Sequence, residues 1–124
     1  MPVVLGIALF GALGAIARYG VDRLSGHRLG SGFPWGTFAV NVVGSLAIGV
    51  AFAFLLGRPD IPLWVKLSLT TGFLGGFTTF SAFSLQTHRL LAEGAYGLAA
   101  AYVVGSVAAG LGAVAVGIAI GRAA

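Results

Sequence analysis

The chain has 124 residues, of which 58% are hydrophobic and only 8% are charged, and its mean hydropathy is +1.02. Because soluble domains carry about 25% charged residues, this composition excludes an ordinary soluble protein and predicts an integral membrane protein. The formal charge of +4 arises from basic residues near the expected helix ends, which is typical of membrane flanks rather than of nucleic-acid binding. We expect an all-α fold, one domain over 1–124, whose four transmembrane helices cover 2–19, 35–57, 64–88 and 95–121.

The first expected span, 2–19, has a smooth surface of small residues that includes Gly11 and Gly14 and suits close helix contact. Arg18 ends its apolar run. The Arg18 guanidinium either extends to the lipid headgroups or attracts anions to a vestibule. The connection from 22 to 34 is rich in Gly, Ser and basic residues, which predicts an interfacial loop, with or without a short helix.

The second expected span begins at Pro34 and Trp35, which suit a helix start and a membrane interface respectively. Asn41 stands inside this otherwise apolar span. An amide in hydrocarbon is costly unless it is hydrogen-bonded, so Asn41 either joins two helices or lines a pore. The two roles are compatible.

The third expected span contains the most unusual segment of the chain. The run 67–87 has no charge and, at about 1.5 Å per residue, is long enough as a helix to cross a bilayer. Its centre is a poor helix former, because the glycines at 75–76 are followed by β-branched threonines at 78–79. We predict a helix broken at the twin glycines, which is tolerated at membrane depth only when buried in protein or lining an aqueous cavity. The alternative is a span that packs closely through small residues.

The ends of the third and fourth spans carry further polar residues. His88 is either a solvated end residue or a metal ligand, and no second ligand lies at a metal-binding spacing. In the fourth span, Tyr102 and Ser106 are spaced i, i+4 and share one face of the helix. Their hydroxyl groups form either hydrogen bonds between helices or part of a polar track.

The distribution of basic residues predicts the topology. With four spans, both termini face the same side of the membrane as the second connection. That side carries Arg58, Lys66 and Arg122, and the other side carries Arg18, Arg23, Arg28 and Arg89. An excess of lysine and arginine on one side of the membrane sets the orientation of a chain. Here the terminal amine makes the positive charges on the two sides equal, so we expect the chain to insert in both orientations. Oppositely inserted copies can then pair as an antiparallel homodimer.

The chemistry of the expected span interiors excludes several functions. No acidic, basic or histidine side chain lies in the central part of any span. Proton-coupled transporters normally use an intramembrane carboxylate or histidine, so passive conduction is favoured. A small multidrug-type exporter needs an acidic residue in its first span, and 2–19 contains none. This exporter and a structural membrane subunit are the alternative functions. No acid–base pair or activated nucleophile is visible, so we do not expect an enzyme.

Phe80 and Phe83 are spaced i, i+3 and lie on one side of the helix that follows the predicted break. On spacing alone, such a pair either packs in a core or presents its positive ring edges to a small anion. Together with the Asn41 amide, the Ser and Thr hydroxyls and a terminal Arg18, these rings form a donor-rich path without carboxylates. That chemistry suits anions.

Two motifs resemble the small fluoride channels of the Fluc or CrcB family. They are GGFTTFSAFS at 75–84 and GTFAVNVVGS at 36–45, and the similarity covers the whole chain, including Arg18 followed by Tyr19. The resemblance implies passive, selective export of fluoride across the cell inner membrane by antiparallel homodimers with two pores.

The resemblance also assigns individual residues. Phe80 and Phe83 match the phenylalanines whose edges face fluoride, and Asn41 matches the pore asparagine. The other residues assigned to the fluoride pore are Arg18 at the vestibule, Ser84, and Tyr102 with Ser106 in the fourth-span hydroxyl track. The next positions at that spacing, Gly110 and Val114, lack hydroxyls. The backbone carbonyls of Gly75 and Thr78 match ligands of a structural sodium ion (Na+) at the dimer centre.

Overall fold

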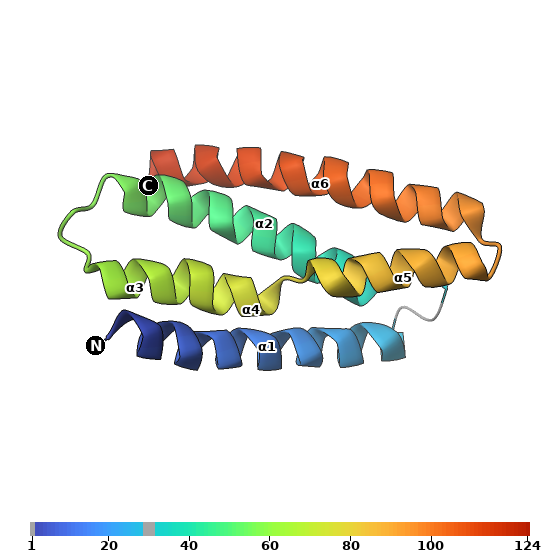
Figure 1. Cartoon of the computed structure of the whole chain (residues 1–124). Helices are drawn as coiled ribbons and strands as arrows, with labels where there is room; N and C mark the ends of the chain where they lie inside the picture. The colour runs from blue at the N-terminus through green and yellow to red at the C-terminus, as the bar shows by residue number, and fades with distance from the viewer. Residues whose placement is uncertain (1, 29–31) are drawn as a thin grey trace.

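The computed structural model describes residues 2–28 and 32–124, and these fold into helices joined by turns (Figure 1). The elements are α1 (Val3–Arg28), α2 (Trp35–Leu56), α3 (Leu63–Leu67), the π-helix η1 (Ser68–Leu74), α4 (Gly75–Phe77), α5 (Phe80–Ala92) and α6 (Tyr96–Ala123). Elements α3 to α5 together form one elongated stretch, so the described chain has four helical stretches lying lengthwise beside one another. The predicted all-α fold is confirmed.

Both ends of the chain lie at the same end of the bundle, beside the turn that joins α2 to α3 (Figure 1). The end of α1, the start of α2 and the turn that joins α5 to α6 lie toward the opposite end. This is the arrangement expected when a chain passes the length of the bundle an even number of times.

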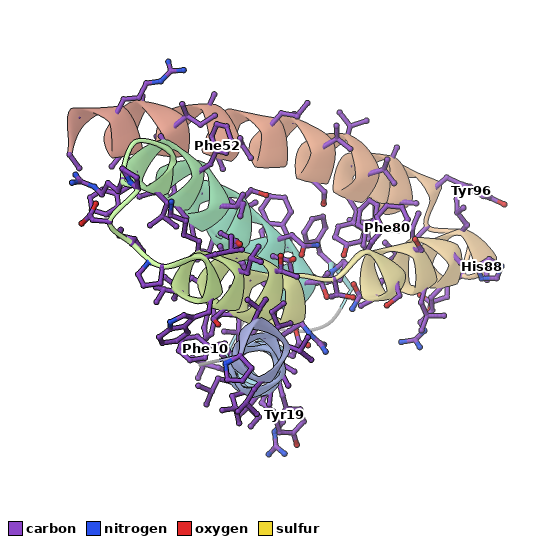
Figure 2. All side chains as sticks on the ribbon, turned by 60° about the vertical axis from the view of Figure 1, so that its left-hand side comes forward. Phe10, Tyr19, Phe52, Phe80, His88 and Tyr96 are labelled. Carbon is purple, nitrogen blue, oxygen red and sulfur yellow. The ribbon has the colours of Figure 1, made fainter. Side chains whose placement is uncertain are left out.

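Three helices of the described chain are long and apolar enough to cross a membrane: Val3–Ser25, Trp35–Leu55 and Tyr96–Ala123. Large apolar side chains on these helices point outward, and Figure 2 shows Tyr19, Phe52 and Tyr96 projecting from the ribbon. Continuous apolar surface of this kind is unfavourable in water and suits contact with lipid or with another membrane helix. Among the residues whose burial the structure describes, the buried hydrophobic core is correspondingly small and consists of Val40, Leu55, Phe77, Leu90, Ala99 and Tyr102.

The four stretches pack as two close pairs, α2 with α6 and α1 with the stretch that contains η1 and α4. Between α2 and α6, a Cβ on Gly49 would lie 3.1 Å from the Gly117 Cα. Between α1 and α4, a Cβ on Gly76 would meet the backbone oxygen of Gly11 and lie 3.2 Å from the Ala15 nitrogen. Glycine at these positions lets the helix backbones approach each other closely, as is common in membrane helices.

Helix α1 is longer than predicted. The expected span ended at 19 and an interfacial loop was expected from 22, but α1 continues to Arg28, and residues 29–31 of that loop lie outside the described residues. Two interactions at i, i+4 spacing support the extension. Arg18 pairs with Asp22 at 3.8 Å, and Arg23 donates a hydrogen bond of 3.2 Å to the Tyr19 hydroxyl.

The location of the predicted break was wrong. Gly75 is helical, with φ −63° and ψ −38°, and Gly76 lies within α4. The extended residues come later, at Thr78 (φ −92°, ψ 157°) and Thr79 (φ −153°, ψ 127°). Glycine propensity favoured 75–76, but Gly76 serves close packing against α1 and stays helical there.

Thr79 begins the next helix. Its side-chain oxygen accepts a hydrogen bond from the Ala82 N–H, so Thr79 is the N-cap of α5. Before the extended residues, Ser68 and Thr70 donate their hydroxyl hydrogens to the carbonyls of Trp64 and Lys66, four residues earlier. Such bonds compete with the regular helical pattern and accompany the wider turns of η1.

Candidate functional site

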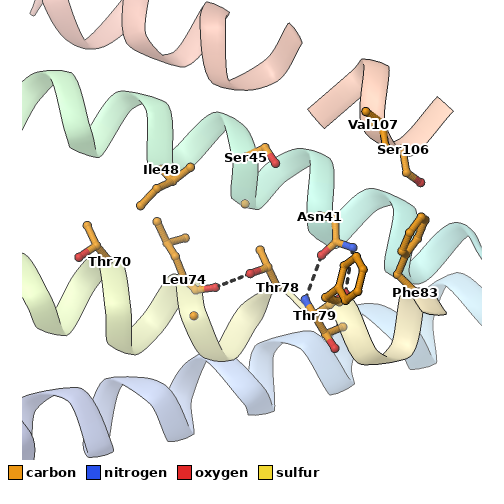
Figure 3. A pocket seen from close by; sticks show the side chains of 13 residues that line it. Asn41, Ser45, Ile48, Thr70, Leu74, Thr78, Thr79, Phe83, Ser106 and Val107 are labelled. Atoms are coloured by element: carbon orange, nitrogen blue, oxygen red, sulfur yellow. Dashed lines mark hydrogen bonds between the residues drawn. The ribbon is translucent and has the colours of Figure 1, made fainter. Parts of the chain in front are cut away.

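A cavity of about 460 Å³, here called the central cavity, lies between α2, α6 and the segment from η1 to α5 (Figure 3). It brings together six residues predicted from the sequence, namely Asn41, Gly75, Thr78, Phe80, Phe83 and Ser106. Its other lining residues are Gly44, Ser45, Ile48, Thr70, Leu74, Thr79 and Val107. None of these lining residues is acidic or basic, so the wall consists of apolar groups, hydroxyls, one amide and backbone.

Asn41 bridges from α2 to the extended backbone at Thr79 (Figure 3). Its Nδ2 donates to the Thr79 carbonyl at 3.2 Å, and its Oδ1 accepts from the Thr79 N–H at 3.0 Å. One side chain therefore satisfies both backbone groups of a residue that has left the helix. A second Nδ2 hydrogen remains for another acceptor, because a primary amide has two N–H donors.

The backbone carbonyls of Gly75 and Thr78 lose their usual helical donors. In a continuous helix the Gly75 carbonyl would accept from the Thr79 N–H, which donates to Asn41 instead. The Thr78 carbonyl would accept from the Ala82 N–H, which donates to Thr79 Oγ1 at 3.3 Å. Gly75 and Thr78 are therefore placed at the central cavity with carbonyl oxygens that their own helix does not use.

The hydroxyl groups of the central cavity differ in what they offer to a ligand. Thr70 donates to the Lys66 carbonyl at 2.8 Å, and Thr78 donates to the Leu74 carbonyl at 2.9 Å. Both threonines therefore have lone pairs but no free hydrogen. Ser106 is different, because its buried Oγ has no hydrogen-bond partner within the described part of the chain. Its hydrogen is free for an acceptor in the cavity.

Phe80 and Phe83 both reach the central cavity, but their surroundings differ. Their ring centroids are 5.8 Å apart, with planes tilted by 44°. Phe83 is half-buried and packs on the Tyr102 ring at 4.9 Å. Phe80 is 78% exposed, so little within the described chain fixes its ring.

Tyr102 lies behind Phe83 rather than in the wall of the central cavity. It is fully buried, and its hydroxyl donates to Gln86 Oε1 at 2.8 Å. Gln86 in turn lines two other cavities, of about 570 Å³ and about 280 Å³. The sequence analysis gave Gln86 no role, although its position three residues after Phe83 on the same helix face was a usable signal.

The structure does not bring Ser84 or Arg18 to the central cavity. Ser84 is exposed on α5 and lies outside the lining residues. Arg18 lies on α1, half-buried and paired with Asp22. His88 is exposed, and the described residues contain no group of three His, Asp or Glu side chains that could hold a metal.

Comparison with known proteins assigns the chain to a family. The model of the family described as "CrcB-like protein, Camphor Resistance (CrcB)" matches residues 5–118. A relative from Methylobacterium sp. (strain 4-46), named "Fluoride-specific ion channel FluC", is 51% identical over 98% of this chain and 94% of its own length. A relative of the same name from Chloroflexus aurantiacus is 44% identical over 98% of this chain and 97% of its own length. Another, from Paracoccus denitrificans, is 51% identical over 95% of this chain and 93% of its own length. These relatives are ion channels and not enzymes, and this chain, a multi-pass membrane protein, belongs to the CrcB-like family.

Proposed function

We propose that the protein is a passive, fluoride-selective ion channel of the cell inner membrane that exports fluoride from the cytoplasm. The observation that carries this proposal is the central cavity, which combines an amide, a free serine hydroxyl and two phenylalanine rings without any charged side chain in its wall. The relatives are named fluoride-specific ion channels, which supports fluoride as the conducted ion. Because no carboxylate or histidine lines this cavity, a proton-coupled cycle has no evident proton carrier there.

Fluoride must lose its hydration shell to pass, and the cavity offers replacements. The second N–H of Asn41 and the O–H of Ser106 donate hydrogen bonds, and the ring edges of Phe80 and Phe83 carry partial positive charge. A compact anion gains more from such short contacts than the larger chloride ion does, because its charge lies closer to the donors. Tyr102, Ser84 and Arg18 belong to the remainder of the route, with Arg18 at its vestibule.

We further propose that two chains pair in opposite orientations and form two pores. In this arrangement the stretch from α3 to α5 also crosses the membrane, as the third of four spans in chain order, and is interrupted at Thr78 and Thr79. The exposure of Phe80 supports pairing, because a ring that is 78% exposed needs a second chain to fix it beside an anion path. The extended backbone supports it as well, since non-helical backbone at membrane depth must be covered by protein or line a cavity.

The carbonyls of Gly75 and Thr78 fit a sodium ion at the dimer centre. Sodium prefers neutral oxygen ligands, and both carbonyls lack their usual helical donors. Two chains would supply two copies of this pair. A cation there would hold the two interrupted stretches together and offset the negative ends of their helix dipoles.

Fluoride efflux from liposomes tests the proposed function. Purified protein is reconstituted with potassium fluoride or potassium chloride inside, and release is followed with ion-selective electrodes after valinomycin lets potassium leave. We expect rapid fluoride release and chloride release no faster than from protein-free liposomes. Equal release of both anions would contradict selectivity, and release of neither would contradict the channel.

A further inference from the structure

One carboxylate lies close to the proposed anion route, on the extended part of α1. Asp22 packs against the first turn of α2, where a Cβ on Gly36 would lie 2.6 Å from Asp22 Oδ1 and 3.1 Å from Asp22 Cα. Glycine at position 36 leaves room for this side chain. The sequence analysis placed Asp22 in a loop, and the extension of α1 brings it to this position instead.

Asp22 lies between two sources of positive potential. Its Oδ2 is 3.8 Å from Arg18 Nη1, and both side chains are about one-third exposed, at 38% and 32%. The other source is the N-terminus of α2, whose first backbone N–H groups lack helical acceptors and whose N-cap, Pro34, contributes no side-chain hydrogen bond. Without Asp22, Arg18 and this helix end would together attract anions.

The surroundings of Asp22 are connected to the central cavity by direct contacts. Asp22, Thr37 and Gln86 all line the cavity of about 280 Å³, here called the side cavity. Gln86 accepts the hydrogen bond of Tyr102, and the Tyr102 ring packs on Phe83, which lines the central cavity. The contacts from Gln86 through Tyr102 to Phe83 would therefore lie between an anion in the side cavity and the central cavity.

We propose that Asp22 weakens anion attraction at the side cavity by acting as a built-in negative charge that neutralises Arg18 and the start of α2. This inference rests on the proposed fluoride channel. The Arg18–Asp22 pair then has no net charge, and the side cavity, which Asp22 lines, does not concentrate anions strongly. Removing one negative charge several ångströms from the path in a water-like medium raises anion occupancy by about two- to fourfold.

Asp22→Asn tests the proposal, with Asp60→Asn as its matched control. Asp60 is an exposed acid in the turn between α2 and α3 and does not line the side cavity. At an ionic strength of about 0.01 M we expect initial fluoride efflux about threefold faster in Asp22→Asn than in wild type, and unchanged in Asp60→Asn. At about 1 M the difference should disappear, because the Debye length falls to about 3 Å. Equal rates for Asp22→Asn and wild type at low ionic strength would overturn the proposal.

Arg18→Gln separates an electrostatic role of Asp22 from a structural one. The net charge of the Arg18–Asp22 pair is zero in wild type and in the double variant, positive in Asp22→Asn and negative in Arg18→Gln. We expect Asp22→Asn to raise the initial rate of an Arg18→Gln channel by about the same factor as it raises the wild-type rate. A double variant no faster than Arg18→Gln would contradict the proposal. If Asp22→Asn is not monodisperse on size exclusion, Asp22→Ser takes its place.

Failure of this inference differs from failure of the proposed function. If wild type releases fluoride and Asp22→Asn releases it at the same rate, only the role of Asp22 is overturned. Absence of fluoride release by wild type would overturn the channel and this inference together.

Discussion

Asn41 holds the extended backbone and also faces the central cavity, so its two predicted roles meet in one side chain. Its amide satisfies both the N–H and the carbonyl of Thr79. In a membrane such a bridge is important because no water is present to satisfy these groups. The same amide keeps one N–H for an acceptor in the cavity.

Replacing Asn41 with Asp tests its contribution to the anion path. The new carboxylate can accept from the Thr79 N–H, but it repels the Thr79 carbonyl and puts a negative charge at the cavity. Because like charges within about 4 Å repel by several kcal/mol in a protein environment, we expect fluoride efflux to fall by about 100-fold or more. Efflux is measured with a fluoride electrode, and Val43→Ala, on the same helix but outside the lining of the central cavity, serves as the control. Undiminished efflux in Asn41→Asp would leave Asn41 with the helix-bridging role alone.

Replacing Phe80 or Phe83 should change protein stability to different extents but should abolish fluoride conduction in both cases. Phe80→Ile removes an exposed ring and should change the thermal stability of a single chain little. Phe83→Ile removes the contact with Tyr102 and should lower stability by about 1 kcal/mol. Both variants should lose fluoride efflux while the protein stays dimeric on size exclusion. Wild-type efflux in either variant would exclude that ring from the anion path.

At the scale of single helices, the sequence predicted the apolar helices well and the irregular segment less well. Helices α2 and α6 are predominantly apolar over lengths that can cross a membrane, so hydropathy alone indicated them. The position of the extended residues depends on a contact between Asn41 and Thr79, which are 38 positions apart and which local propensity cannot connect. Threonine is common at N-caps, but the sequence analysis considered the threonines at 78–79 only as poor helix formers and gave Thr79 no capping role.

The glycines at 75–76 are therefore better explained by packing, at least for Gly76. Gly76→Ala would force a methyl group against the backbone of Gly11 on α1 and should destabilise the protein by about 1–3 kcal/mol. Gly112→Ala is the matched control, because Gly112 is also helical and a Cβ there meets no atom of the described chain within 4 Å. It should be neutral or stabilising by up to about 1 kcal/mol. Thermal unfolding in detergent compares the two, and equal stability would contradict the packing role of Gly76.

At the scale of the whole molecule, both termini share one end of the bundle, and the basic residues are divided almost evenly between the two ends. The sequence predicted the shared end from the number of spans. It could not predict that Asp22 and Gln86 line the same cavity, because that depends on the length of α1 and its approach to α2. Oligomeric state stays a prediction from charge balance and from the exposed Phe80.

Orientation in the membrane can be tested with reporters fused to the C-terminus. Because neither side has a clear excess of basic residues, we expect both a cytoplasmic and an extracytoplasmic reporter to be active. Adding two arginines after Arg122 should shift the chain to one orientation and reduce fluoride efflux, since antiparallel partners become scarce. Activity of only one reporter in the wild-type chain would exclude dual insertion.

The central claim is passive conduction of fluoride through a path without proton carriers. The most direct measurement is fluoride efflux from liposomes at equal pH on both sides, followed before and after valinomycin is added. A passive channel predicts almost no efflux until potassium can accompany fluoride, then rapid efflux that an imposed proton gradient does not accelerate. Efflux that proceeds without valinomycin, or that needs the proton gradient, would contradict the account and indicate a proton-coupled exporter.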